Sequence, residues 1–163
     1  MLSQYNYAKI VFMNTQLEEI VLSKSIQESL DGCLYFSIKR LERTLDKYTE
    51  DAFRKLGMSH SYALVLFILS QENGKRCKDL AEILCIAPPS LSKIVYKLAQ
   101  QELVTITQDG RIKHIYITDK GRELVPEILQ IFNETREKFM EMNQDYNLSG
   151  FIKDVNYLRE KIK

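Results

Sequence analysis

The sequence predicts a mostly α-helical protein with one small β-hairpin. Only six glycines and three prolines occur among 163 residues, and this scarcity favours helices over a fold rich in sharp turns. Apolar residues recur at spacings of three and four over long stretches, which is the helical period. The pattern changes to that of β-strands in one short region around Asp109-Gly110. A helical body that carries a single hairpin follows from these observations.

The N-terminal part is expected to form a short arm and one long helix. We predict the arm over residues 1–15 and the helix over residues 16–48, with a break near Asp31-Gly32. Apolar residues along the helix share one face, namely Ile20, Ile26, Leu30, Leu34, Ile38, Leu41 and Leu45. Another apolar surface must cover such a stripe.

Three shorter helices are predicted next. Ser59 has the hydroxyl of an N-cap, and the helix from Ser59 to Gln71 is apolar on nearly every side, which places it centrally in the core. Two further helices, at residues 77–84 and 88–101, are separated by the few residues typical of a helix-turn-helix. The second of them starts at Pro88-Pro89, because proline suits a first helical turn. Its buried face is predicted to consist of Leu91, Ile94, Val95 and Leu98.

A β-hairpin is predicted directly after the helix-turn-helix. Its strands are expected at residues 103–107 and 112–117, both rich in β-branched residues. Asp109-Gly110 favours a type I′ turn, and a tight turn there pairs Val104 with Ile115. A hairpin in this position is a wing.

Two helices are expected to complete the chain. Thr118 is the predicted cap of a helix over residues 119–142, with a kink before Pro126. The last helix is predicted over residues 148–162. Its apolar seam is able to face a partner helix and consists of Phe151, Val155, Leu158 and Ile162.

The candidate DNA contacts lie on the second motif helix and on the wing. A helix that enters the major groove needs an apolar back and small polar or basic residues on its front. Five residues fall off the apolar stripe, namely Ser90, Ser92, Lys93, Tyr96 and Lys97. Arg111 and Lys113 follow on the hairpin. The combination favours binding to double-stranded DNA over the alternative, a merely solvated helix face.

The overall charge requires any DNA-binding surface to be local. Lys and Arg total 23, against 22 for Asp and Glu. Six basic residues occur between Arg76 and Lys113, namely Arg76, Lys78, Lys93, Lys97, Arg111 and Lys113, against the acids Asp79, Glu82, Glu102 and Asp109. Each neutralised phosphate contributes about 0.9 to the log–log salt slope, so this small surplus predicts moderate salt dependence.

Residues 34–121 resemble the MarR family of bacterial regulators. The resemblance rests on Leu80-Ala81-Glu82, on residues 90–98 (SLSKIVYKL) and on residues 109–121 (DGRIKHIYITDKG). The last stretch is similar to the family's wing signature, which is Asp-x-Arg, a strand and then Leu-Thr-x-x-Gly. Glu102 stands where the family often has glycine.

The resemblance implies how the chain is organised and what it does. It implies that Arg111 enters a minor groove, that Asp109 helps to place it, and that the flanking helices build a homodimer on a near-palindromic operator. The expected divisions are residues 1–48 (arm and dimerisation helix), 49–120 (DNA-binding lobe) and 121–163 (dimerisation helices). The protein is expected to act in the cytoplasm as a repressor of transcription, and no membrane is expected among its partners.

A small aromatic or anionic effector is a further implication of the resemblance. Family ligands sit between the dimerisation helices and the DNA-binding lobe. In this chain that region is expected to be lined by Phe36, Arg40, His60, Tyr62 and Leu66. An arginine beside aromatic rings can hold a carboxylate through a charge-assisted hydrogen bond. The alternative is that these are ordinary interface and core residues.

The remaining chemistry-bearing residues do not form a catalytic or metal-binding motif. Cys33, Cys77 and Cys85 lack the spacing of zinc ligands, and we interpret all three as packing residues, with Cys33 as a redox switch the alternative. His114 is expected on the wing, either at the DNA backbone or in a cross-strand role. We therefore expect no cofactor, no metal and no enzymatic activity. The main alternative function is an adaptor that uses a winged-helix dimer to bind another protein.

Overall fold

The computed structural model describes residue 30 and residues 32–162, so the predicted arm and much of the first predicted helix lie outside the described residues. Contacts divide the chain into two units, Met1–Asp51 and Ala52–Lys163. Helix α2 (Leu34–Phe53) lies largely within the first predicted helix and extends beyond its predicted end at residue 48.

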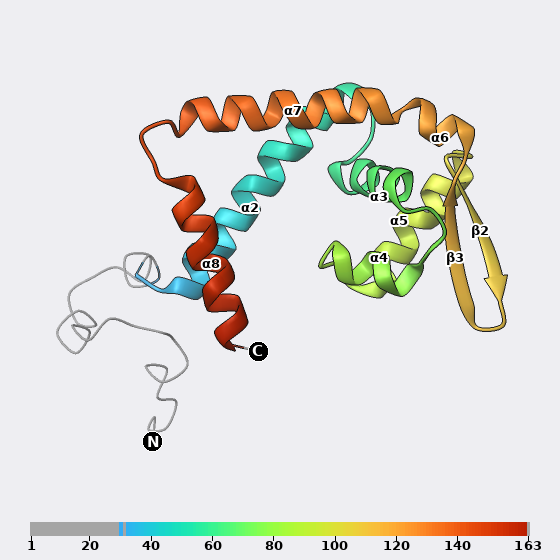
Figure 1. Cartoon of the computed structure of the whole chain (residues 1–163), viewed down its shortest axis with the longest axis horizontal. Helices are drawn as coiled ribbons and strands as arrows, with labels where there is room; N and C mark the ends of the chain where they lie inside the picture. Colours follow the sequence, from blue (N-terminus) through green and yellow to red (C-terminus); the bar gives the residue numbers. More distant parts are fainter. Residues whose placement is uncertain (1–29, 31, 163) are drawn as a thin grey trace, which may run out of the picture. The chain divides into compact units, whose positions relative to one another are not determined.

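The second unit combines helices with a small antiparallel sheet (Figure 1). Its helices are the 3-10 turn η2 (Arg54–Leu56), α3 (His60–Gln71), α4 (Cys77–Ile83), α5 (Pro88–Gln100), α6 (Asp119–Glu123), α7 (Val125–Met142) and α8 (Leu148–Ile162). Its strands are β1 (Lys75–Arg76), β2 (Val104–Asp109) and β3 (Ile112–Ile117), in the order β1-β3-β2. The predicted fold class, mostly helical with a hairpin wing, is confirmed. Strand β1 was not predicted, because two residues are too few to show a period.

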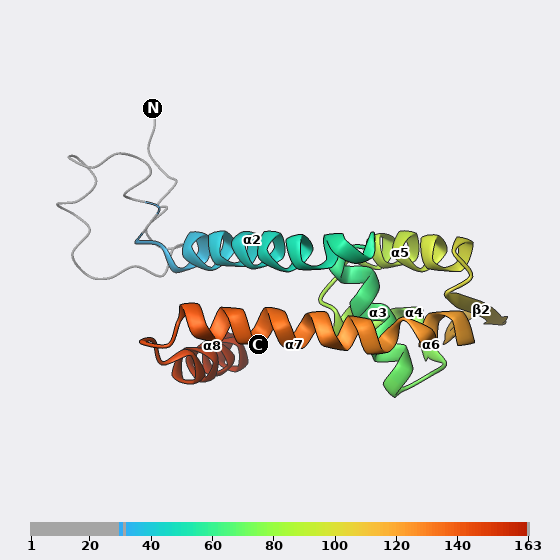
Figure 2. The same cartoon turned by 90° about the horizontal axis from the view of Figure 1, so that it is seen from above.

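Helix α3 is the centre of this unit, as its all-round apolar sequence predicts. It packs against both α5 and α7 (Figure 2). Ala63, Val65, Leu66 and Leu69 are fully buried on it. The Ser59 hydroxyl accepts a hydrogen bond from the Tyr62 amide at 3.4 Å, which confirms the predicted N-cap. The other elements contribute Phe53, Leu80, Leu91, Val95, Leu98, Val104, Ile115, Ile117 and Ile128 to the same core.

Both helices of the helix-turn-helix end in the same hydrogen-bond pattern. After α4, the Ile86 amide donates to Ala81 O and the Cys85 amide to Glu82 O, with Cys85 at φ 52°. After α5, the Leu103 amide donates to Leu98 O and the Glu102 amide to Ala99 O, with Glu102 at φ 61°. These pairs are Schellman motifs, whose left-handed position usually carries glycine. Cys85 lies in the turn after α4, but the prediction that it is a packing residue is wrong, because the turn holds it exposed.

Replacing Glu102 with glycine is expected to stabilise the protein by about 0.5–1.5 kcal/mol, because a left-handed residue with a Cβ costs about 1–2 kcal/mol. The change also removes the exposed ion pair between Glu102 and Lys120 (3.3 Å), which contributes at most about 1 kcal/mol. Urea denaturation measures the change. The control is Glu102→Ala, which loses the ion pair but keeps the strained backbone. A glycine variant no more stable than the alanine variant contradicts the expectation.

The hairpin register differs from the predicted one. Val104 pairs with Ile117 and Ile106 with Ile115, so the predicted Val104–Ile115 pair is wrong. The two loop residues are Gly110 and Arg111, and Asp109 belongs to β2. Because Gly110 has φ 57° while Arg111 is not at positive φ, the turn has the pattern of type II′ rather than type I′. The observed register places the two buried residues Val104 and Ile117 opposite each other.

The C-terminal helices follow the prediction closely. The predicted helix over residues 119–142 is interrupted at Leu124, so that Pro126 falls in the first turn of α7. Thr118 caps α6, because its hydroxyl accepts from the Gly121 amide at 3.0 Å. Within residues 30 and 32–162, no helix combines the length and the apolar character needed to cross a bilayer.

Candidate nucleic-acid interface

Helix α5 presents all five predicted contact residues to solvent. Leu91, Val95 and Leu98 are buried, and this apolar back attaches the helix to the core. The opposite side exposes Ser90, Ser92, Lys93, Tyr96 and Lys97. Tyr96 is 62% exposed although its ring is large and partly apolar. The front of α5 therefore has the residue types and the accessibility that a major-groove helix needs.

The lysines on α5 are available to a ligand. Lys93 and Lys97 form no ion pair or hydrogen bond with the described residues. The Ser92 hydroxyl, in contrast, donates to Pro88 O at 3.0 Å and lies 3.9 Å from the Cys77 Sγ atom. To contact a ligand, the Ser92 hydroxyl would have to exchange or share this helix hydrogen bond.

The first turn of α5 contributes few backbone donors. Pro88 and Pro89 have no N–H group, and the amides of Ser90 and Leu91 both donate to Ala87 O, at 2.9 and 3.1 Å. The anion-binding amides that many helix N-termini offer are thus missing or engaged here. The groups that α5 offers to a ligand are therefore its side chains.

The tip of the wing is exposed and basic. Asp109, Arg111 and Lys113 are all exposed, and within the described part of the chain no hydrogen bond or ion pair joins Asp109 to Arg111. The turn is held instead by Gln108, whose Nε2 atom donates to Gly110 O at 2.9 Å. Sequence reasoning missed this role, because a glutamine near a turn carries no distinctive pattern.

The base of the wing is tied to the loop after α3. The Ile117 amide donates to Asn73 Oδ1 at 2.9 Å, and His114 Nδ1 lies 3.0 Å from Gly74 O. Gly74 has φ 75°, and a Cβ there would collide with the ring of Tyr116. His114 is therefore a half-buried anchor of the wing. These contacts join residues about forty positions apart, so no local sequence pattern predicts them.

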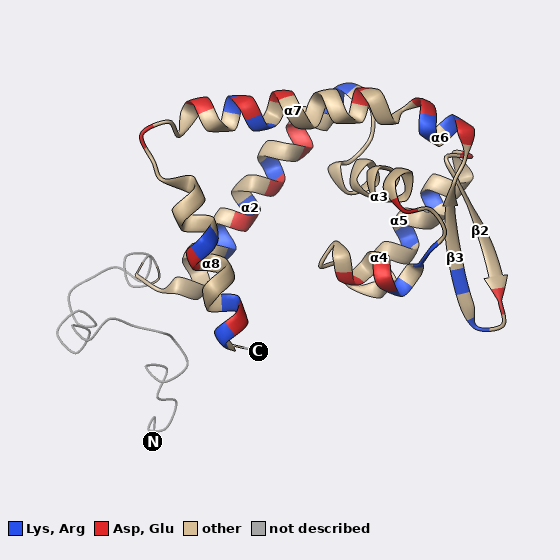
Figure 3. Ribbon diagram, in the orientation of Figure 1, with Lys and Arg blue, Asp and Glu red and all other residues tan. Residues whose placement is uncertain are grey.

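Basic residues lie on α4, α5 and the wing, where Figure 3 draws them in blue. Ion pairs divide those between Arg76 and Lys113 into two groups. Arg76 makes a bidentate pair with Asp79 at 2.7 and 2.8 Å, and this hydrogen bonding raises the pKa of Arg76 and lowers the pKa of Asp79. Lys78 lies 3.7 Å from Glu82. Between Arg76 and Lys113, the four basic residues without such partners among those described are Lys93, Lys97, Arg111 and Lys113. The unpaired positive charge is thus concentrated on α5 and the wing.

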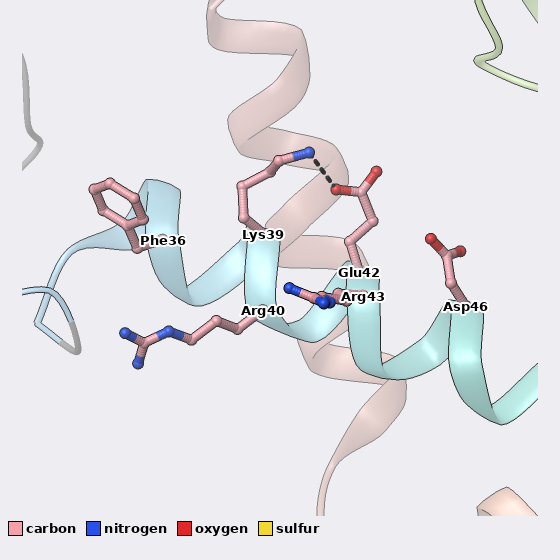
Figure 4. A pocket seen from close by; sticks show the side chains of 6 residues that line it. All are labelled: Phe36, Lys39, Arg40, Glu42, Arg43 and Asp46. Carbon is pink, nitrogen blue, oxygen red and sulfur yellow. Dashed lines mark hydrogen bonds and ion pairs between the residues drawn. The ribbon is translucent and has the colours of Figure 1, made fainter. Parts of the chain in front are cut away.

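The predicted effector residues fall into four different environments. Phe36 and Arg40 line a surface hollow of about 410 Å³ on α2, together with Lys39, Glu42, Arg43 and Asp46 (Figure 4). Lys39 is paired with Glu42 at 2.8 Å, and this hydrogen bond raises the pKa of Lys39.

The other three residues predicted to line the effector region belong to the second unit. His60 packs against the rings of Phe53 and Phe132, with centroids 5.5 and 5.7 Å away. Tyr62 lines a second hollow, beside α5. Leu66 is fully buried in the core, so the expectation that it lines a ligand site is wrong.

Comparisons with known proteins agree with this geometry. The sequence model of the MarR family matches residues 58–112, which run from the start of α3 to the tip of the wing. A comparison with curated protein sequences gave no match.

Solved structures share the fold at low sequence identity. The MepR–DNA complex of S. aureus superposes with a TM-score of 0.68 at 17% identity, covering 80% of this chain and 98% of that one. The regulator BldR of Sulfolobus solfataricus gives 0.66 at 24% identity, covering 85% and 99%. The repressor CouR bound to p-coumaroyl-CoA gives 0.70 at 18% identity, covering 80% and 94%.

The described residues have the winged-helix fold of these solved structures. Residues 58–112 match the MarR family, and this segment runs from the start of α3 through the helix-turn-helix to the wing.

Proposed function

We propose that the protein binds a specific DNA sequence as a homodimer, with α5 in the major groove and the wing at the adjacent minor groove. One observation carries the proposal. Lys93 and Lys97 on the exposed front of α5, and Arg111 at the wing tip, have no ion-pair partner among the described residues. Lys93 or Ser90 can reach base edges, whereas Lys97, Tyr96 and Lys113 suit the backbone. Asp109 is expected to orient Arg111 only when DNA is bound.

A dimer is supported by apolar side chains near the C-terminus. Leu158 and Ile162 of α8 are 41% and 68% exposed and belong to the predicted seam. A two-fold dimer predicts a near-palindromic operator with half-sites about one helical turn apart. Repression in the cytoplasm is the expected mode of action, since the similar structures include a DNA complex and a repressor.

Release by a small effector is the second part of the proposal. Arg40 and Phe36 line the same hollow on α2, where a guanidinium and an aromatic ring suit a small aromatic or anionic molecule. The similar structure of CouR holds p-coumaroyl-CoA, which supports ligand control in this fold.

Selection of binding sites from random double-stranded DNA tests the main proposal. The expected result is an enriched near-palindrome, bound with an affinity that falls as salt rises, because Lys and Arg contacts release counterions. Analytical ultracentrifugation of the same complex reports its subunit number. No enrichment, or binding that ignores salt, favours the protein-binding adaptor instead.

Replacing Arg111 with alanine is expected to weaken operator binding several-fold without changing stability, because the side chain is exposed and makes no hydrogen bond with the described residues. The loss is expected to be largest on operators with A·T-rich flanks, where a narrow minor groove attracts arginine. Fluorescence anisotropy on A·T-rich and G·C-rich flanks measures the difference. Arg111→Lys is the control for charge alone, and equal losses on both flanks contradict minor-groove insertion.

A further inference from the structure

A hollow of about 550 Å³ lies where the start of α3 meets α5. The residues that line it are Tyr62 from α3 and Ser92, Lys93, Ile94, Tyr96, Lys97 and Gln100 from α5. The sequence grouped Tyr62 with the effector residues, whereas the structure places it among the side chains of the recognition helix. Tyr62 is the one lining residue that does not come from α5.

Apart from the Ser92 hydroxyl, which donates to Pro88 O, the polar side-chain groups around this hollow have no partners within the described residues. Neither the Lys93 and Lys97 ammonium groups nor the Tyr62 hydroxyl makes a hydrogen bond or ion pair there. Polar atoms that converge on one hollow without bonding to each other can bind a common ligand. Two cations and a phenol O–H fit an anion that accepts hydrogen bonds.

Tyr62 is rigidly held. Its ring is half-buried and packs against the core, and its amide takes part in the Ser59 cap of α3. A phenol fixed on a central helix loses little conformational freedom when it binds, in contrast to the long lysine side chains. Its hydroxyl is thus suited to fix the position of a ligand, while the lysines supply charge.

We propose that Tyr62 binds a phosphate of the DNA backbone beside the recognition helix, with its hydroxyl donating to a phosphate oxygen that Lys93 or Lys97 neutralises. This inference rests on the proposed DNA binding and adds a contact from outside α5. Backbone phosphates flank the groove that a recognition helix occupies, so a donor beside α5, on a neighbouring helix, meets the backbone. Tyr62 then helps to set the register of α5 and reads no base.

The variant Tyr62→Phe tests the inference, because it removes only the hydroxyl and keeps the packed ring. We expect operator affinity to fall by about 3- to 10-fold, the effect of one lost hydrogen bond. The loss is expected to be the same for every DNA sequence. The log–log salt slope is expected to stay unchanged, since a neutral phenol releases no counterion. Tyr146→Phe, which alters an exposed tyrosine between α7 and α8, is the matched control.

The outcomes separate this inference from the proposed function. If the parent protein selects no DNA, the proposed function fails and the inference fails with it. If the parent binds DNA and Tyr62→Phe binds equally well, only the inference is overturned. A loss confined to some sequences indicates base reading and also overturns it.

A free anion is the remaining alternative occupant of the hollow. Sodium phosphate and sodium chloride, compared at equal ionic strength, test for it. Binding of millimolar phosphate to the parent but not to Tyr62→Phe, with DNA still bound as tightly as in chloride, indicates a site for free phosphate that DNA does not occupy and contradicts the backbone contact. Equal displacement by the two salts supports the backbone contact.

Discussion

Replacing Gly121 with alanine is expected to lower the free energy of unfolding by about 1–3 kcal/mol, the usual cost of overpacking a core position. Gly121 is buried in α6, and a Cβ there would overlap the carbonyl oxygen of Leu103 and the side chain of Ile117. The obstacle is backbone, which cannot rotate away as a side chain can. The Leu103 carbonyl is also held, because it accepts from the Thr118 amide at 3.1 Å.

Denaturation in urea at a fixed protein concentration measures this loss, since the stability of the proposed dimer depends on concentration. The matched control is Arg122→Ala, at the next and exposed position of the same helix, which is expected to change stability by less than about 0.5 kcal/mol. Equal stability of the two variants contradicts the close approach of α6 to Leu103. Because Gly121 joins α6 to the base of the wing, the alanine variant is also expected to bind DNA more weakly.

Replacing Lys93 with alanine is expected to weaken operator binding by about 1–3 kcal/mol if the side chain reads a base. Lys93 is exposed on the front of α5 and has no partner among the described residues, so folding does not depend on it. Loss of a base contact relaxes the preference at one operator position, whereas loss of a phosphate contact lowers the salt slope by about 0.9 for each contact.

Binding-site selection with the variant, followed by a salt titration, distinguishes these two roles. Lys138→Ala on α7 removes the same charge outside the winged helix and controls for net charge. Its affinity is expected to remain close to that of the parent. A Lys93→Ala variant that binds as tightly as the parent and keeps the same sequence preference contradicts the assignment of α5 as the recognition helix.

Local signals in the sequence were sufficient for most of the fold. The Ser59 and Thr118 caps, the kink before Pro126 and the limits of α8 are each decided within a few residues of chain. The exposed front of α5 was equally predictable, because helical spacing separates Leu91 and Leu98 from Lys93. The MarR-type ending Thr-x-x-Gly now has a physical reason, since Thr118 caps the turn and Gly121 clears the Leu103 carbonyl.

The errors arose where distant segments compete or cooperate. The residues around Gly110 are compatible with both type I′ and type II′ turns. The register that pairs buried Val104 with buried Ile117 decides between the two turn types. The left-handed backbone at Cys85 and Glu102 could not be predicted from the sequence, because neither position holds a glycine.

By itself, the sequence determined the helical period, the caps, the hairpin and the residues that front α5, because each depends on neighbours along the chain. Tertiary structure alone decided the hairpin register, the tie between His114 and Gly74, and the place of Tyr62 beside Lys93 and Lys97. The physical reason is that these features depend on contacts between residues far apart in the chain, and such contacts form only when the whole core packs.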